Sequence, residues 1–229
     1  MRLDKFIADG AALSRKDSRD AIKKGLALVE GQVIRDIAFQ IDENASVTLN
    51  GENISYVKHI YIMLNKPAGY VSATEDTHQK TVLELLDPKF KRYSLFPVGR
   101  LDIDTEGFLL LTNNGTFAHD ILSPSKKVGK TYFVELENEI SDNDIALLEK
   151  GVDIGECITK PAKVKRMSAN EIMLTITEGK FHQIKRMAHS IKNNVTYLKR
   201  VAYGNLYLDE TLKKGEYKVI DEEIIMKEI

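Results

Sequence analysis

The sequence predicts an α+β protein: a small N-terminal module, then a larger domain with a mixed, mostly antiparallel sheet and flanking helices. Strand-like runs outnumber helix-like runs and do not alternate regularly with them, which argues against a doubly wound parallel sheet. A chain of 229 residues is long enough for one sizeable core and one small extra domain. We therefore expect one domain at residues 1–58 and a second at residues 59–229.

The overall composition is that of an ordinary soluble globular protein, with 43% hydrophobic and 29% charged residues. A single cysteine, Cys157, excludes an intramolecular disulfide and suits a reducing cytosol. The N-terminus carries no long apolar run, and no segment approaches the roughly 20 apolar residues of a membrane span. We expect a cytoplasmic monomer without a membrane partner.

The charge is unevenly distributed along the chain. The formal net charge is only -1, which by itself argues against a nucleic-acid-binding protein. Residues 160–204, however, contain ten basic residues and only two acidic ones. Segregated positive charge of this kind is typical of a surface that binds a polyanion.

The N-terminal module begins with two predicted helices. Leu3, Phe6 and Ile7 mark the apolar side of the first. Ser14 is a typical N-cap for the second, and Gly25 fits just past its end. After this helix we expect a hairpin at residues 26–34, a strand at residues 47–49 and a linker at residues 53–60.

The second helix carries basic residues at four-residue steps, Arg15, Arg19 and Lys23, so they lie on one helical face. A solvated charged face is an equally good interpretation of this stripe alone. Together with Arg2-Leu3-Asp4-Lys5-Phe6, Ser14-Arg15 and Val29-Glu30-Gly31, however, the stripe resembles the S4-type RNA-binding domain. The resemblance implies that this module grips structured RNA by its phosphates. The residues it implicates are Arg2, Lys5, Ser14, Arg15, Lys16, Arg19 and Lys23.

The larger domain is predicted from its apolar runs and turn residues. We expect strands at residues 59–64, 108–111, 129–136, 162–166, 171–177, 196–201, 205–208 and 217–220. We expect helices at residues 81–86, 116–122 and 141–150, and a further helix after Gly179.

A charged loop between two apolar runs is the first candidate for a functional site. Gly99 and Gly107 punctuate its ends and allow sharp backbone turns, and Asp102 lies between them. A calcium loop starting at Asp102 is disfavoured, because Asn113 stands where the bidentate glutamate belongs. A glycosidase using Asp102 and Asp104 remains open, although it does not explain the RNA-binding module.

The helix after Gly179 is the second candidate. Its buried stripe is predicted at Ile184, Met187, Ala188 and Ile191. On another face, His182, Lys185, Arg186 and His189 fall within about 100° of arc, which favours a phosphate or carboxylate partner over a merely solvated face. The spacing of the histidines does not fit a zinc site, and no phosphate-binding glycine-rich loop or nucleophile elbow is present.

Four motifs, taken together, resemble the pseudouridine synthases: Leu64-Asn65-Lys66-Pro67, Gly99-Arg100-Leu101-Asp102, Lys130-Thr131-Tyr132 and the run from Glu178 to Met187. The resemblance implies that Asp102 is the catalytic carboxylate, that Tyr132 stacks on a flipped uracil, and that Lys185 pairs with Asp102, with Arg186 as the competing partner. It also implies substrate or RNA contacts by Arg100, Lys66, His182 and Gln183. Isomerisation of uridine oxidises nothing, so no cofactor and no metal are expected.

The motif order, with the S4-like module in front, resembles the branch that acts on small-subunit ribosomal RNA. This implies uridine 516 of 16S rRNA as target, within an assembling small subunit. Ala188 and Tyr203-Gly204 depart from the usual pattern and leave the target less certain. The alternatives are a large-subunit (23S) rRNA enzyme and a non-catalytic ribosome-assembly protein that binds RNA.

Overall fold

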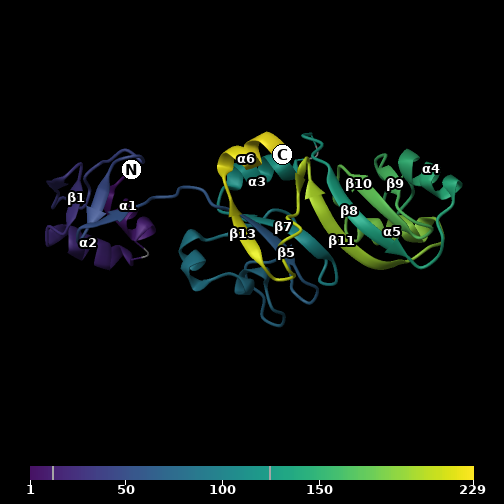
Figure 1. Ribbon diagram of the computed structural model, residues 1–229, viewed down its shortest axis with the longest axis horizontal. Coiled ribbons are helices and arrows are strands. Elements are labelled where there is room, and N and C mark those ends of the chain that lie inside the picture. The colour runs from purple at the N-terminus through teal and green to yellow at the C-terminus, as the bar shows by residue number, and fades with distance from the viewer. Residues whose placement is uncertain (12, 124) are drawn as a thin grey trace. The chain divides into compact units, whose positions relative to one another are not determined.

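The computed structural model describes residues 1–11, 13–123 and 125–229 (Figure 1). Contacts divide the chain into two compact units. The first comprises residues 1–59 and 87–94, and the second comprises residues 60–86 and 95–229. No helix in the described ranges combines the length and apolar character needed to span a bilayer.

The first unit pairs two helices with a four-stranded antiparallel sheet in the order β2-β1-β3-β4. Its elements are α1 (Leu3–Gly10), α2 (Arg15–Lys23), β1 (Ala27–Val29), β2 (Gln32–Val33), β3 (Val47–Leu49) and β4 (Glu52–Ile54). Leu3, Phe6, Ile7 and Ile22 form its core with apolar residues of β1 and β3. The predicted helices and hairpin are confirmed, including the N-cap, where Ser14 accepts from the Asp17 backbone N–H.

One prediction for this unit is wrong. The linker was expected to span residues 53–60, but its first two residues, Asn53 and Ile54, belong to β4 and pair with β3. Glu52 and Asn53 are exposed on this edge strand, so the apolar alternation that reveals a strand is missing.

The second unit is built on a nine-stranded sheet in the order β13-β5-β7-β11-β8-β10-β9, with β12 on β11 and β6 on β7. Neighbours pair antiparallel, except that β7 and β11 run parallel, which confirms the mixed sheet. The strands are β5 (Tyr61–Lys66), β6 (Phe96–Pro97), β7 (Glu106–Thr112), β8 (Lys130–Leu136), β9 (Lys163–Arg166), β10 (Glu171–Ile176), β11 (Val195–Tyr203), β12 (Leu206–Tyr207) and β13 (Tyr217–Ile220).

Helices cover this sheet. The helical segments of this unit are η1 (Val82–Leu85), α3 (Gly115–Leu122), α4 (Asp142–Lys150), α5 (Gln183–Ser190) and α6 (Glu222–Glu228), whereas η2 (Pro88–Tyr93) belongs to the first unit. The helices α3 and α6 lie side by side (Figure 1) and share a core with β5 and β7. The expected helices are confirmed, whereas η2 and α6 were not predicted. Of the residues of α6 only Ile225 is buried, so its apolar signal is weak.

The parallel contact between β7 and β11 depends on Gly107. Its φ is +96°, and a Cβ at this position would lie 2.2 Å from the carbonyl oxygen of Arg200. A side chain is therefore excluded here. The close approach brings the loop of residues 99–105, here called the Asp102 loop, next to the buried residues of β11.

Candidate active site

A pocket of about 930 Å³ lies in the second unit. It is lined by residues of the Asp102 loop, of β8 and β11, and of the segment that leads into α5. The structure brings together six of the predicted site residues here: Arg100, Asp102, Tyr132, His182, Gln183 and Lys185. Lys66 and Arg186 do not line it. Within the described ranges, no cluster of three or more His, Cys, Asp or Glu is arranged to hold a metal ion.

Lys66 anchors the Asp102 loop from beneath. Its side chain is completely buried, and its Nζ donates to the carbonyl oxygens of Pro67, Asp102, Ile103 and Thr105 at 2.8–3.3 Å. The prediction that Lys66 contacts RNA is therefore wrong, because no surface of its ammonium is accessible. The strand was expected to end at residue 64, but β5 continues through Lys66 and carries the side chain inward.

Two further contacts fix the same loop. The Ser72 hydroxyl donates to the Leu101 carbonyl oxygen at 3.1 Å and accepts from the Leu101 N–H at 3.0 Å. The Gly69 N–H donates to the carbonyl oxygen of Ile103 at 2.7 Å. The backbone on both sides of Asp102 is thus held by the protein before any substrate arrives, which is the condition for a preorganised reacting group.

Lys185 lies between two carboxylates of this loop. Its Nζ is 3.4 Å from Asp102 Oδ2 and donates to both carboxylate oxygens of Asp104 at 2.6 and 2.7 Å. Burial raises the pKa of Asp104, but the hydrogen bond and the charge of Lys185 outweigh it and hold that pKa below its usual value. Asp104 therefore holds the Lys185 ammonium at the loop, within 3.4 Å of the Asp102 carboxylate.

Arg186 points away from Asp102. Its guanidinium pairs with Glu156 at 3.1 Å and donates to the backbone oxygens of Phe181 and Ile154. The competing pairing of Arg186 with Asp102 does not fit this arrangement, whereas its contact with RNA stays a prediction, because the side chain is 25% exposed. Adjacent helix positions project about 100° apart, so only one of the two cations can face the loop.

The segment before α5 holds an imidazole and an amide in different roles. His182 takes a left-handed backbone conformation at the start of α5, with Nε2 3.7 Å from Asp102 Oδ1. The ring of the exposed Phe181 stacks on it at 3.8 Å. Gln183 is buried, accepts from the Lys180 N–H and donates to Glu178. Its amide holds the loop, and because the residue also lines the pocket, the contact with substrate or RNA stays a prediction.

Tyr132 is buried in the pocket wall on β8. Lys130 lies two residues earlier, on the same face of the strand, because side chains alternate along β8. Arg200 of β11 is the pairing partner of Tyr132 in the sheet. Lys130 and Arg200 were not predicted as site residues. The signal that would have found them is a charged residue at an inward position of a strand.

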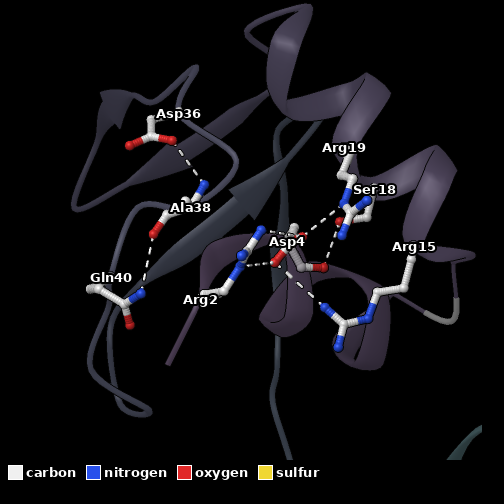
Figure 2. A network of polar contacts seen from close by, with 8 residues as sticks. All are labelled: Arg2, Asp4, Arg15, Ser18, Arg19, Asp36, Ala38 and Gln40. Carbon is white, nitrogen blue, oxygen red and sulfur yellow. Dashed lines mark hydrogen bonds and ion pairs between the residues drawn. The ribbon is translucent and has the colours of Figure 1, made fainter.

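The first unit gathers predicted RNA-binding residues around one carboxylate. Figure 2 shows Arg2, Arg15 and Arg19 converging on Asp4, at nitrogen–oxygen distances of 3.1, 3.4 and 2.9 Å. Asp4 is fully buried, whereas the arginine side chains are 45–49% exposed. The backbone carbonyl of Asp4 accepts from Ser18, which ties α1 to α2.

The other predicted residues of this unit lie apart from that cluster. Lys5, Lys16 and Lys23 are exposed. Ser14 is also exposed, but its hydroxyl donates to the Asp17 carboxylate at 2.6 Å and caps α2. Its role here is structural.

Comparison with known proteins identifies the family. The RNA pseudouridylate synthase family matches residues 60–190, and the S4 domain family matches residues 1–47. The chain is 48% identical to the RNA pseudouridine synthase YtzG of Bacillus subtilis (strain 168), over 97% of this chain and 96% of that protein. It is 39% identical to ribosomal small subunit pseudouridine synthase A of Escherichia coli (strain K12), over 98% of each.

A solved structure agrees with these matches. A crystal structure of a pseudouridylate synthase superimposes with a TM-score of 0.70 at 34% identity, and the match covers 100% of both chains. With an S4 domain in front of the matched catalytic region, the chain belongs to the RNA pseudouridylate synthase family, the isomerases that convert uridine in RNA to pseudouridine.

Proposed function

We propose that this protein isomerises one uridine of ribosomal RNA, uridine 516 of 16S rRNA, in an assembling small subunit in the cytoplasm. Relatives named ribosomal small subunit pseudouridine synthase A, from Escherichia coli and Vibrio cholerae, are 39% and 40% identical and match over at least 97% of both chains. Similarity over the whole length, including the RNA-binding module, favours a shared substrate class.

One observation carries the chemistry. The Asp102 carboxylate lies on a loop fixed by backbone contacts, with Lys185 3.4 Å away and Tyr132 lining the same pocket. In the proposed reaction the C1′–N1 bond breaks, the base turns, and a C1′–C5 bond forms while C5 loses a proton and N1 gains one. Asp102 drives bond cleavage by acting on the ribose or the base, or by taking a proton from the sugar.

The remaining pocket residues follow from this assignment. Lys185 places a positive charge 3.4 Å from the Asp102 carboxylate. Tyr132 offers an aromatic face to a uracil that has left the base stack, and assists removal of the C5 proton. Arg100, exposed at the pocket lining, fills the gap left by the flipped base or holds a phosphate.

The S4 unit supplies binding that does not depend on base sequence. Arg2, Arg15 and Arg19, oriented by Asp4, together with exposed lysines, suit contacts to phosphate oxygens. These contacts position the RNA, while the pocket of the second unit carries out the reaction.

The test is primer extension after carbodiimide treatment, which leaves a stable adduct on pseudouridine. Ribosomal RNA from cells lacking the enzyme is incubated, free and as assembling particles, with wild type, Asp102→Asn or the control Asp120→Asn. Asp120 is an exposed residue of α3, so its variant retains activity. We expect a stop at uridine 516 with wild type and the control, and none with Asp102→Asn.

Other stops are equally informative. A stop in 23S rRNA retains the isomerase and overturns the small-subunit target. No stop with wild type on either RNA or particle favours a non-catalytic RNA-binding protein. Release of free uracil indicates a glycosidase.

A further inference from the structure

Two cations lie buried in the pocket wall without an anionic partner. Lys130 is 8% exposed and Arg200 is 1% exposed, and both line the pocket. No carboxylate of the described residues forms an ion pair with either side chain. Burying a charge without a partner is costly, so such a pair requires an explanation.

Arg200 is satisfied on one side only. Its Nε donates to the Phe108 carbonyl oxygen at 2.7 Å, and its guanidinium lies over the ring of Tyr203 at 4.2 Å. Its Nη2 is buried with no hydrogen-bond partner among the described residues. The contacts to Phe108 and Tyr203 fix the guanidinium, and the two N–H groups of Nη2 remain without an acceptor among the described residues.

The two cations flank Tyr132. Lys130 is two residues away on the same face of β8, and Arg200 is directly opposite in the sheet, with its Cζ 6.0 Å from the ring centroid. Burial lowers the pKa of Lys130, and the charge of Arg200 lowers it further. The cations thus repel one another, and an anion between them relieves that repulsion.

The burial of Lys130 and Arg200 in the pocket wall indicates which kind of anion can reach them. A phosphate belongs to the RNA backbone and stays near the pocket mouth, whereas the flipped base is the part of the nucleotide that reaches the buried wall. Uracil is neutral as part of uridine. When the C1′–N1 bond breaks, the bonding electron pair stays with the base, and negative charge spreads over N1, O2 and O4.

We propose that Lys130 and Arg200 form an anion site for the uracil, stabilising the charge that the base carries between cleavage of the C1′–N1 bond and formation of the C1′–C5 bond. The assignment rests on the isomerisation proposed above. The charge disappears when the C1′–C5 bond forms, because the base then gives an electron pair back to C1′. The proton that C5 loses afterwards is balanced by the one that N1 gains, so the base stays neutral. A site that strengthens only while the charge exists lowers the barrier without tightening substrate binding.

The experiment combines Lys130→Met with the target RNA carrying uridine, 2-thiouridine or 4-thiouridine at the modified position. Rates are measured in single turnovers at saturating RNA. We expect Lys130→Met to slow the uridine reaction about 10²-fold, the usual effect of losing one donor to a developing anion, while the Kd for RNA changes by less than about threefold. Sulfur carries negative charge with less need of a hydrogen bond, so the loss shrinks to about tenfold with one of the thiouridines.

A second pocket variant and a control guard against misfolding. Arg200→Lys keeps the charge and shortens its reach, and we expect a slower reaction with the same thio response. Lys150→Met removes an exposed lysine of α4 outside the pocket and outside the basic segment 160–204, and leaves every rate unchanged. If Lys130→Met does not fold, Lys130→Gln replaces it.

Each other result overturns the assignment. An equal loss for uridine and both thiouridines indicates a structural role for Lys130. A weakened Kd with a shallower salt dependence and an unchanged saturating rate indicates a phosphate site. The reaction of the wild-type protein tests the proposed function separately. If that function is wrong, neither the wild type nor any variant forms pseudouridine.

Discussion

In the first unit three arginines converge on the carboxylate of Asp4, whereas in the second unit Lys130 and Arg200 have no carboxylate partner among the described residues. Water solvates about half of each arginine side chain, and Asp4 fixes the direction of the guanidinium groups. Lys130 and Arg200 are almost completely removed from water. The desolvation free energy of these positive charges is therefore small in the first unit and large in the second.

This difference in burial matches a difference between the two anions: each region suits an anion that persists for a different time. An RNA backbone is negative throughout the encounter, so an exposed, pre-oriented cluster serves it. A leaving base is negative only during the reaction, so buried cations without a carboxylate partner among the described residues serve it. Lys66 is a third case, a buried cation whose ammonium is satisfied by backbone oxygens of the Asp102 loop.

The largest expected effect comes from Lys66→Met. It leaves buried carbonyl oxygens without a donor and releases the Asp102 loop. We expect the free energy of unfolding of the second unit to fall by about 3–5 kcal/mol and the single-turnover rate to fall about 10²-fold. Urea unfolding and rapid-quench assays measure the two quantities. An unchanged rate would contradict the anchoring role of Lys66.

Asp4→Asn is expected to have the next largest effect, confined to the first unit. The amide cannot neutralise the arginines and accepts on one atom only. Opening of the first unit should become easier by about 2–3 kcal/mol. Hydrogen exchange of peptides from residues 1–59 measures this, with peptides from β7 as the internal control. Equal changes in both sets would argue against a local effect.

The same carboxylate makes the first unit sensitive to acid. Burial raises the pKa of Asp4, but hydrogen bonds from Arg2 and Arg19 and the charges of Arg2 and Arg15 together hold it below 3.8. As pH falls below about 4, the unfolded chain takes up the proton first, and the stabilisation is lost as pH falls through the lowered pKa. In Asp4→Asn this acid dependence should be absent.

Much of this architecture could be predicted from the sequence because it follows local rules. The N-cap at Ser14, the buried run of β7 and the stripe of α5 each follow from neighbouring residues. Asp102, Tyr132 and Lys185 were found as motifs, and all three line one pocket.

The missed features depend on tertiary structure. Lys66 lies just past the predicted end of its strand at residue 64, and only the pairing of β5 with β7 carries its side chain under the loop. Arg200 becomes a neighbour of Tyr132 through the pairing of β11 with β8. Lys185 and Arg186 are adjacent in sequence, and the position of Glu156 accounts for the direction Arg186 takes.

Lys130→Met tests whether the buried cation destabilises the second unit, and its expected effect is smaller. Replacing an unpartnered buried cation by an apolar side chain of similar length removes a desolvation cost. We expect the free energy of unfolding of the second unit to stay equal or to rise by about 1 kcal/mol, although the reaction is slowed. Urea unfolding of wild type and Lys130→Met measures this, with Lys150→Met as control. A loss of several kcal/mol would mean that Lys130 is satisfied within the fold.

The smallest effect is the alkaline response of Lys66. Burial lowers its pKa to about 8, although the charges of Asp104, Glu106 and Asp102 raise it in part, whereas an unfolded lysine titrates near 10.4. Above pH 8 the unfolded chain holds the proton that the folded chain has released, so this group makes stability rise with pH, by about 0.7 kcal/mol between pH 7.5 and 8.5. The neutral amine has only two N–H donors for the loop carbonyls, so the isomerisation rate should fall over the same interval. Stability should therefore rise with pH while the rate falls, and both slopes should be absent in Lys66→Met. That result would identify Lys66 as a cation that anchors the loop and not as one that binds an anion of the substrate.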